Sequence, residues 1–297
     1  MDTINTRSNA NEIETAFQLA VTGKVHDNPS DSEKWKQRAI QILKHPIKFS
    51  ALAISLTQAK IANIVIIKNI KLFWGDSMTI AIPEQVSQLL WVFGYFEPGL
   101  SKIVIDHVHP GDIFFDAGAH YGYFSLLSAS LGAKCHAFEP TPLTYAILHR
   151  NALGRNININ NFALYDHSGY VRFDDCGVEY ASYNHVSSKH DNNGYNVRCM
   201  KLDEYVEQTG AIPNFIKIDA EGAEYAILNG GRKTIENHKP KITLETGHDG
   251  TYKAIDYLLE IGYTPYECRN GKMVIYNHTE KDNRYNNILF VPSSNPS

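Results

Sequence analysis

Five acidic residues stand where short apolar runs of the sequence end, and their type and spacing could do chemistry. Each of these runs predicts a β-strand, and the acids that end them are Asp116, Glu139, Asp166, Asp219 and Glu245. In an open α/β sheet, ligands bind beyond the carboxyl ends of the strands, so the five acids would gather at one mouth. Such a mouth attracts cations, and its carboxylates can accept hydrogen bonds from a ribose diol.

The stretch IFFDAGAHYGYF, residues 113–124, predicts a strand, a tight turn and the start of a helix. A phosphate-binding P-loop has Lys and then Ser or Thr after its last glycine, whereas Gly122 is followed by Tyr123. The dinucleotide fingerprint needs glycine where this chain has His120, because the backbone approaches a pyrophosphate there. A ligand with a ribose, a positive centre and no phosphate fits better, and S-adenosylmethionine has these properties.

Residues after the fourth and fifth predicted strands could activate an acceptor. Lys217 and Asp219 are two apart on a strand and therefore point to the same side. A hydroxyl acceptor needs a base or a metal ion to become nucleophilic. The candidate catalytic residues are Asp219, Glu221, Glu245 and His248. The same side chains could alternatively bind a hard divalent cation, but no spacing is diagnostic and no metal ligand is assigned.

The elements that must position these residues alternate between strand and helix from residue 110 to about residue 261. Antiparallel strands with an Asn270-Gly271 turn then close the chain. This order predicts an α/β fold with a mostly parallel sheet, an added antiparallel part and helices on both faces. The section 165–197, rich in tyrosine and asparagine, could line a polar acceptor pocket.

Residues 1–82 are predicted to form an N-terminal extension of helices and a hairpin, and residues 83–297 the main domain. Helices are expected over 32–44 and 48–62, and a hairpin over 70–83. The longest apolar stretch, residues 47–67, contains two lysines and further polar residues. It falls short of about 20 clean apolar residues, so a helix of the core is expected rather than a membrane span.

Composition narrows the class of protein. The chain has 297 residues, of which 43% are hydrophobic and 20% charged, as in an ordinary globular protein. Its formal net charge is -4, which gives no bulk reason to expect a nucleic-acid partner. The 4 cysteines are widely spaced, as expected of reduced thiols in a cytoplasmic protein, and the N-terminus does not resemble a secretion signal.

Residues 110–151, PGDIFFDAGAHYGYFSLLSASLGAKCHAFEPTPLTYAILHRN, resemble the opening of class I S-adenosylmethionine-dependent methyltransferases. Together with NNFALYDHSG and IKIDAEGAEYAILNGG, the chain from about Pro83 to Glu245 resembles the FkbM-type family, a group of mainly O-methyltransferases. The resemblance does not cover residues 1–70. It implies a Rossmann-like methyltransferase fold with a seven-stranded sheet. It also implies S-adenosylmethionine as cofactor and a hydroxyl on a small polar acceptor, such as a sugar, glycan or natural product.

The same resemblance implies roles for individual residues at the cofactor. Glu139, followed by Pro140, would hold the ribose hydroxyls, and Phe162 and Ala163 would lie against adenine. Asp219 would lie beside the transferred methyl group. The turn around the methionine part would consist of Asp116, Gly118, Ala119, His120, Tyr121 and Gly122. The family often has Asn at the position of His120, so only the side-chain contact there is expected to differ.

Alternative functions remain open from the sequence. A protein that keeps this fold as a non-catalytic binding or interaction module would show the same strand and helix pattern. A nicotinamide-dependent oxidoreductase is disfavoured by His120 and by the acidic mouth. Lys217, Asp219 and Glu245 are partly similar to the Lys-Asp-Lys-Glu set of ribose-methylating RNA enzymes, but the acidic composition disfavours RNA. The sequence leaves the oligomeric state undetermined.

Overall fold

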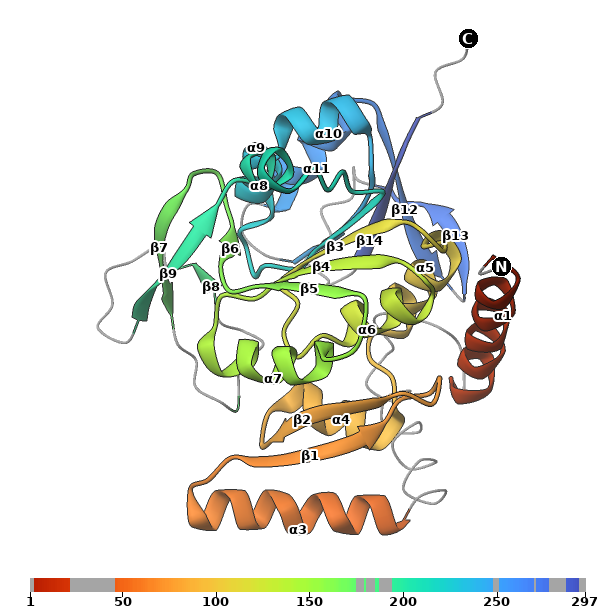
Figure 1. Ribbon diagram of the computed structural model, residues 1–297, viewed down its shortest axis with the longest axis vertical. Helices are drawn as coiled ribbons and strands as arrows, with labels where there is room; N and C mark the ends of the chain where they lie inside the picture. Colours follow the sequence, from red (N-terminus) through yellow and green to blue (C-terminus); the bar gives the residue numbers. More distant parts are fainter. Residues whose placement is uncertain are drawn as a thin grey trace.

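The structure is a computed structural model that describes residues 3–21, 46–174, 179, 185–186, 194–247, 251–269, 271–277 and 287–293. Its centre is an eight-stranded sheet with the order β13-β12-β14-β11-β10-β3-β4-β5 (Figure 1). Five of these strands are mutually parallel: β3 (Ile113–Ala117), β4 (Lys134–Phe138), β5 (Ile157–Asn160), β10 (Phe215–Ile218) and β11 (Lys241–Glu245). The carboxyl ends of the acid-terminated strands β3, β4, β10 and β11 therefore meet at one edge, as the sequence predicts.

Three antiparallel pairings complete this sheet. β14 (Asn287–Pro292) runs opposite to β11, β12 (Tyr263–Arg269) runs opposite to β14, and β13 (Lys272–Ile275) runs opposite to β12. The predicted parallel core and antiparallel end are confirmed. The sheet has one strand more than the expected seven, because the hairpin after Arg269 adds β13 at the edge.

Helices cover both faces of the sheet, since successive residues of a strand point to opposite sides. Phe114 of β3 packs with α5 (Pro98–His107), α6 (Tyr123–Ser130) and α7 (Pro142–Ala152). Its neighbour Phe115 packs on the other face, which four helices cover. They are α8 (Leu202–Thr209), α9 (Glu224–Gly230), α10 (Arg232–His238) and α11 (Thr251–Glu260).

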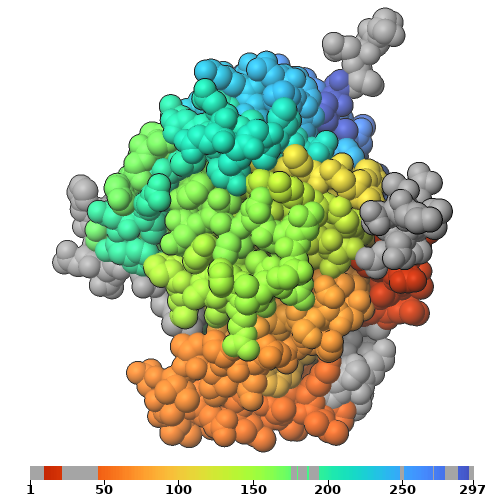
Figure 2. Space-filling model, in the orientation of Figure 1, coloured from red at the N-terminus to blue at the C-terminus, as the bar shows by residue number. Residues whose placement is uncertain are grey.

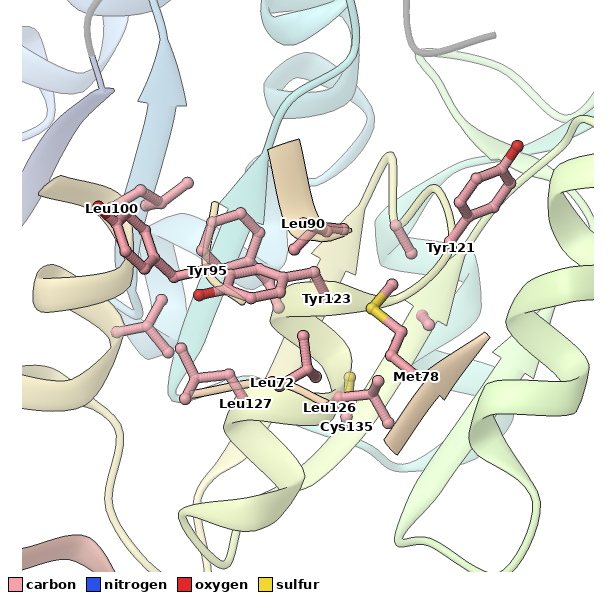
Figure 3. Packing of buried hydrophobic residues seen from close by; sticks show 14 of the residues in the cluster. Leu72, Met78, Leu90, Tyr95, Leu100, Tyr121, Tyr123, Leu126, Leu127 and Cys135 are labelled. Carbon is pink, nitrogen blue, oxygen red and sulfur yellow. The ribbon is translucent and has the colours of Figure 1, made fainter. Parts of the chain in front are cut away.

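The N-terminal elements pack on the same side as α5 to α7. They are α1 (Thr3–Ala20), α3 (Pro46–Ala62), β1 (Ile66–Lys71), β2 (Ser77–Ile82) and α4 (Gln85–Phe93). The hydrophobic core is continuous across them, because Phe17, Met78 and Leu90 belong to the same buried cluster as Leu126 of α6. Figure 3 shows several of these side chains converging around Tyr123.

The predicted N-terminal elements are found where the chain is described. The helix over 48–62 and the hairpin over 70–83 correspond to α3 and to β1–β2, and the predicted helix over 32–44 lies outside the described residues. The expectation of a core helix is wrong for α3, which buries only Leu52, Ser55 and Ala59. None of the described helices is long and apolar enough to cross a membrane.

A second, four-stranded sheet departs from the sequence prediction. The expected strand over 157–166 is divided between β5 and β6 (Ala163–Leu164), because β6 turns away to pair with β9 (Gly194–Met200). β9 also pairs with β7 (Gly169–Asp174), which in turn pairs with β8 (His185–Val186). Asp166 therefore lies beyond this small sheet and not at the mouth of the main one.

Helices α5, α8 and α10 lie where the sequence pattern predicted none. Residues 195–206 were predicted to be strand-like, but Leu202 and Tyr205 are three apart and both buried, which is a helical spacing. Gly210 then ends α8 in the left-handed conformation. Helix α5 begins at Pro98, a residue type favoured in the first turn of helices.

Candidate functional site

A cavity of about 500 Å³ lies at the carboxyl edge of the parallel strands. Its walls come from the turn between β3 and α6, from the ends of β4, β10 and β11, and from residues of β2 and α4. Leu164, Phe173 and Val186 of the small sheet close another side. The cavity therefore lies where ligands bind in open α/β sheets, between the main sheet and the two parts of the chain that cover it.

The turn after β3 is held by the backbone of neighbouring strands. Gly118 has φ 75°, and its N–H and that of Ala119 both donate to the carbonyl oxygen of Phe138 at 3.1 Å. A Cβ on Gly118 would lie 1.8 Å from the backbone oxygen of Asp219. Glycine is thus required here because β3 and β10 approach closely.

Asp116 is fully buried beneath the turn and does not line the cavity. Its carboxylate forms an ion pair with Nζ of Lys217 at 3.2 Å and accepts a hydrogen bond from Oγ of Ser125 at 2.6 Å. Lys217 stands opposite Asp116 in the register of β10 and β3. The two residues therefore join adjacent strands immediately below the cavity floor.

Lys217 also reaches the cavity side of its strand. Its Nζ lies 3.2 Å from Oδ2 of Asp219, and it donates to the carbonyl oxygen of Gly118 at 3.2 Å. Burial alone would lower the pKa of Lys217, but the carboxylates of Asp219 and Asp116 outweigh burial and raise it. The ammonium thus remains charged and holds the Asp219 side chain at the end of β10.

Three carboxylates lie close together where the cavity meets the ends of β10 and β11. Oxygens of Asp219, Glu221 and Glu245 all lie within 4.8 Å of one another. Burial, and then the nearby carboxylates of Asp219 and Glu221, together raise the pKa of Glu245 to about 10. At neutral pH Glu245 therefore carries a proton that it can donate to Asp219. A cationic group in the cavity would lower this pKa by favouring the charged carboxylate.

Glu139 follows β4 and is 6% exposed. One carboxylate oxygen accepts the backbone N–H of His120 at 3.0 Å, and the other accepts that of Thr141 at 2.8 Å. Burial raises the pKa of Glu139 to about 7, although these hydrogen bonds act in the opposite direction. Each oxygen retains a lone pair, so Glu139 can still accept hydrogen bonds from a diol.

The structure brings together most of the residues expected at the site. Those that line the cavity are Gly118, Ala119, His120, Glu139, Pro140, Ala163, Asp219, Glu221 and Glu245. Asp116, Tyr121, Gly122 and Phe162 do not line it, and Tyr121 is fully buried behind the turn. His248 lies outside the described residues.

Sequence reasoning missed a wall of the cavity that comes from before β3. Met78 of β2, Val86 and Leu90 of α4, and Phe96 and Glu97 before α5 all line the cavity. The segment Glu97-Pro98-Gly99 fell within the family resemblance, but nothing in its pattern indicated contact with a ligand. Tertiary packing of the hairpin and α4 against α6 decides this contact, and local sequence does not encode it.

The cavity residues fit S-adenosylmethionine by the chemistry of their donor and acceptor atoms. Glu139 offers carboxylate oxygens suited to the ribose diol, and the acid group at the other end suits the cationic sulfonium and ammonium. Among the described residues, Nε2 of His120 is buried at the cavity without a hydrogen-bond partner. A ligand with polar atoms at this point would satisfy it.

Comparison with known proteins gives a family match over the same segment. A model described as the Methyltransferase FkbM domain matches residues 116–265, about half of the chain. The match begins at the end of β3 and ends in β12. It therefore includes the glycine turn, Glu139 and the acid group, and excludes the N-terminal elements.

Two curated proteins are similar to parts of the chain. Hexuronic acid methyltransferase AglP of Haloferax volcanii is 26% identical over 146 residues, covering 48% of this chain and 59% of that protein. The 31-O-demethyl-FK506 methyltransferase FkbM of Streptomyces tacrolimicus is 36% identical over 69 residues, covering 22% of this chain and 26% of that protein. The chain thus spans less than two thirds of either relative.

Among solved structures, the methyltransferase FkbM from Methylobacillus flagellatus KT matches with a TM-score of 0.42 and 18% identity. The match covers 84% of this chain and 60% of the other.

Proposed function

The chain belongs to the FkbM family of methyltransferases, and from this premise we propose that it is an S-adenosylmethionine-dependent O-methyltransferase. Its acceptor is a hydroxyl on a small polar molecule, such as a sugar, a glycan or a natural product. The observation that carries the proposal is the division of the cavity into two chemical ends. Glu139, after β4, lies at one end, the three carboxylates after β10 and β11 lie at the other, and the glycine turn after β3 lies between them.

The cofactor end consists of residues that bind without reacting. Glu139 accepts the ribose hydroxyls, and its position is fixed by the backbone N–H groups of His120 and Thr141. Ala163 and Leu164 offer an apolar surface for adenine. S-adenosylmethionine, when bound, supplies a methyl group on a sulfonium, which a nucleophile can displace in line.

The acceptor end consists of residues that orient a hydroxyl and take its proton. Asp219 is the proposed base, because Lys217 holds its carboxylate at the cavity while one side of it stays accessible. Glu245, which carries a proton at neutral pH, donates to Asp219 or to the acceptor oxygen and so helps to fix both. Much of the acceleration of such a displacement comes from positioning the two reactants.

The class of acceptor is inferred from the names of the two curated relatives. One name specifies a hexuronic acid and the other an O-demethylated natural product. A hexuronic acid is a sugar acid with hydroxyl groups, and an O-demethylated compound carries a hydroxyl where the methyl group is missing. Carboxylates such as those of Asp219, Glu221 and Glu245 accept hydrogen bonds from hydroxyls.

Calorimetry with purified protein tests the cofactor part of the proposal. S-adenosylmethionine and S-adenosylhomocysteine should bind, and NAD should not. Binding of NAD alone would overturn the proposal. Incubation with a panel of sugar acids and polyhydroxylated natural products should then release S-adenosylhomocysteine with at least one acceptor. Cofactor binding without turnover on any acceptor would favour the non-catalytic alternative.

A further inference from the structure

The outer side of α3 carries a row of exposed isoleucines at one end of the molecule. Ile47, Ile54 and Ile61 are 83%, 59% and 82% exposed, and we call them the isoleucine ridge. They are seven residues apart, so they align along one side of a helix roughly 25 Å long at about 1.5 Å per residue. Figure 1 places α3 at the lower end of the molecule, and Figure 2 shows the same segment exposed there.

Further apolar side chains extend this surface beyond the helix. Ile64 and Val65 follow α3 and are 51% and 37% exposed, and Ile67 on β1 is 43% exposed. Single exposed apolar residues are ordinary, but six of them lie within residues 47–67, although Ser50, Thr57 and Gln58 separate the three isoleucines on the helix. Such a concentration of exposed apolar side chains marks a site of interaction. Packing against the protein core does not account for these exposed residues, because α3 contacts β2 and α4 through a different side, on which Leu52, Ser55 and Ala59 are buried.

The charge around the ridge indicates what covers it. Residues 46–71 contain four lysines and no acidic residue, in a chain whose formal net charge is -4. The rest of the chain therefore sums to -8, so this segment is the basic part of an acidic protein. Lys48 and Lys60 are exposed and stand next to Ile47 and Ile61 in the sequence, and Lys71 is exposed at the end of β1. The lysines are Lys48, Lys60, Lys68 and Lys71.

This charge disfavours a second copy of the chain as the occupant. A twofold interface brings the same surface against itself, so lysines would face lysines. An anionic membrane surface instead attracts lysines that lie close to it. A convex row of isoleucines also suits insertion among lipid headgroups, because a bilayer needs no complementary groove.

We propose that α3 and the residues that follow it dock this protein on the surface of an anionic lipid bilayer. The isoleucine ridge enters the boundary between headgroups and acyl chains, and the flanking lysines contact the anionic headgroups. The protein binds on the membrane and does not cross it. This inference is independent of the proposed transfer reaction, because none of the ridge residues lines the cavity.

Vesicle sedimentation with the full chain tests the proposal. The protein should sediment with vesicles of phosphatidylcholine and phosphatidylglycerol and much less with phosphatidylcholine alone, and binding to the anionic vesicles should weaken as salt is raised. The triple variant Ile47→Gln, Ile54→Gln, Ile61→Gln should lose at least about tenfold in vesicle affinity, since burial of isoleucine is strongly favourable. Lys48→Gln with Lys60→Gln should weaken binding to the anionic vesicles only.

A matched control replaces three exposed apolar residues elsewhere. Leu153, Ile212 and Ile275 are 63%, 43% and 69% exposed, and their change to Gln should leave vesicle binding intact. If the ridge triple variant fails to fold by circular dichroism, the double variant Ile47→Gln, Ile61→Gln serves instead. Absence of binding to anionic vesicles, or equal binding by ridge and control variants, would overturn the proposal. A dimer in light scattering that only the ridge variant dissociates, without vesicle binding, would also overturn it.

Discussion

At the scale of single residues, the site depends on acids that the fold treats differently. Asp116 is fully buried and ion-paired, Glu139 is buried and hydrogen-bonded by backbone N–H groups, and Glu245 carries a proton at neutral pH. Asp166 makes an exposed hydrogen-bond contact with Nδ1 of His167 at 2.8 Å, away from the cavity. Four acids that look alike at strand ends in the sequence thus have four different roles, decided by the groups around each carboxylate.

The raised pKa of Glu139 predicts that cofactor affinity depends on pH. A ribose diol donates to the ionised carboxylate, and with a pKa of about 7 the ionised fraction falls about tenfold between pH 8 and pH 6. Affinity for S-adenosylmethionine in calorimetry should fall by about the same factor. Glu139→Gln should abolish this pH dependence. It should also lower affinity by about 10- to 150-fold, because a charge-assisted hydrogen bond is lost.

The control for this pH dependence is His120, which also lines the cavity and whose pKa burial lowers. The pH dependence of cofactor affinity should persist in His120→Asn. If it is lost in that variant, the imidazole of His120 and not Glu139 is the titrating group. The stability of the ligand-free protein should change in the opposite sense. Because folding raises the pKa of Glu139 from 4.5 to about 7, the folded state binds more protons in that window, and the contribution of Glu139 to stability falls as pH rises.

Substitution of Asp219 tests its proposed role as the base in methyl transfer. Asp219→Asn keeps the size of the side chain and removes its ability to accept a proton, so turnover should fall by about 100-fold or more. Cofactor affinity should change much less, since the ribose and adenine contacts lie elsewhere. Turnover and affinity are measured on one preparation, together with thermal unfolding. Asp166→Asn is the matched control, because Asp166 also ends an apolar run but lies outside the cavity.

Near-normal turnover in folded Asp219→Asn protein would mean that Asp219 serves only as the partner of Lys217. A chelator added to the wild type then separates two ways of activating the acceptor. Loss of activity that magnesium restores would identify Asp219, Glu221 and Glu245 as ligands of a cation. Unchanged activity would favour direct proton transfer to Asp219.

At the scale of elements, the alternation of strands and helices could be predicted from the sequence. The elements that were predicted wrongly have physical causes. The strands β3, β4, β10 and β11 are short apolar runs that each end within one residue of an acid, and local pattern predicts them correctly. β6 was misplaced because Ala163 and Leu164 pair with β9, a partner more than thirty residues away that no local signal specifies. The cavity wall of Met78, Val86 and Leu90 was missed for the same reason.

Gly118 shows how an element boundary constrains the site. Gly118→Ala should destabilise the protein by more than about 3 kcal/mol, because its Cβ would meet the backbone oxygen of Asp219 and force β3 from β10. Gly210→Ala is the matched control, since Gly210 has a similar φ of 67° with no atom near its Cβ position. The control should cost about 1–2 kcal/mol from backbone strain alone. Equal losses in urea unfolding would contradict the close approach of the two strands.

At the scale of the whole molecule, the hydrophobic core crosses the proposed boundary between residues 82 and 83. Ile13 and Phe17 of α1 belong to the same buried cluster as Leu126 and Leu127 of α6. The ring of Phe17 also makes an edge contact with Phe73, with centroids 5.4 Å apart. We therefore expect the N-terminal extension and the main domain to unfold together, even though only the latter carries the family match.

Phe17→Ala tests this expectation. The side chain is fully buried, so its removal should lower the free energy of unfolding by about 3–5 kcal/mol. The three tryptophans, at positions 35, 74 and 91, all lie before β3, so fluorescence reports on the chain up to α4, whereas circular dichroism reports on all helices and strands. Both signals should shift to lower denaturant by the same amount and remain coincident, as in a single cooperative transition. Leu19→Ala, at a position 78% exposed on the same helix, should leave both unchanged. A shift in fluorescence alone would show that the elements before β3 unfold independently of the parallel sheet.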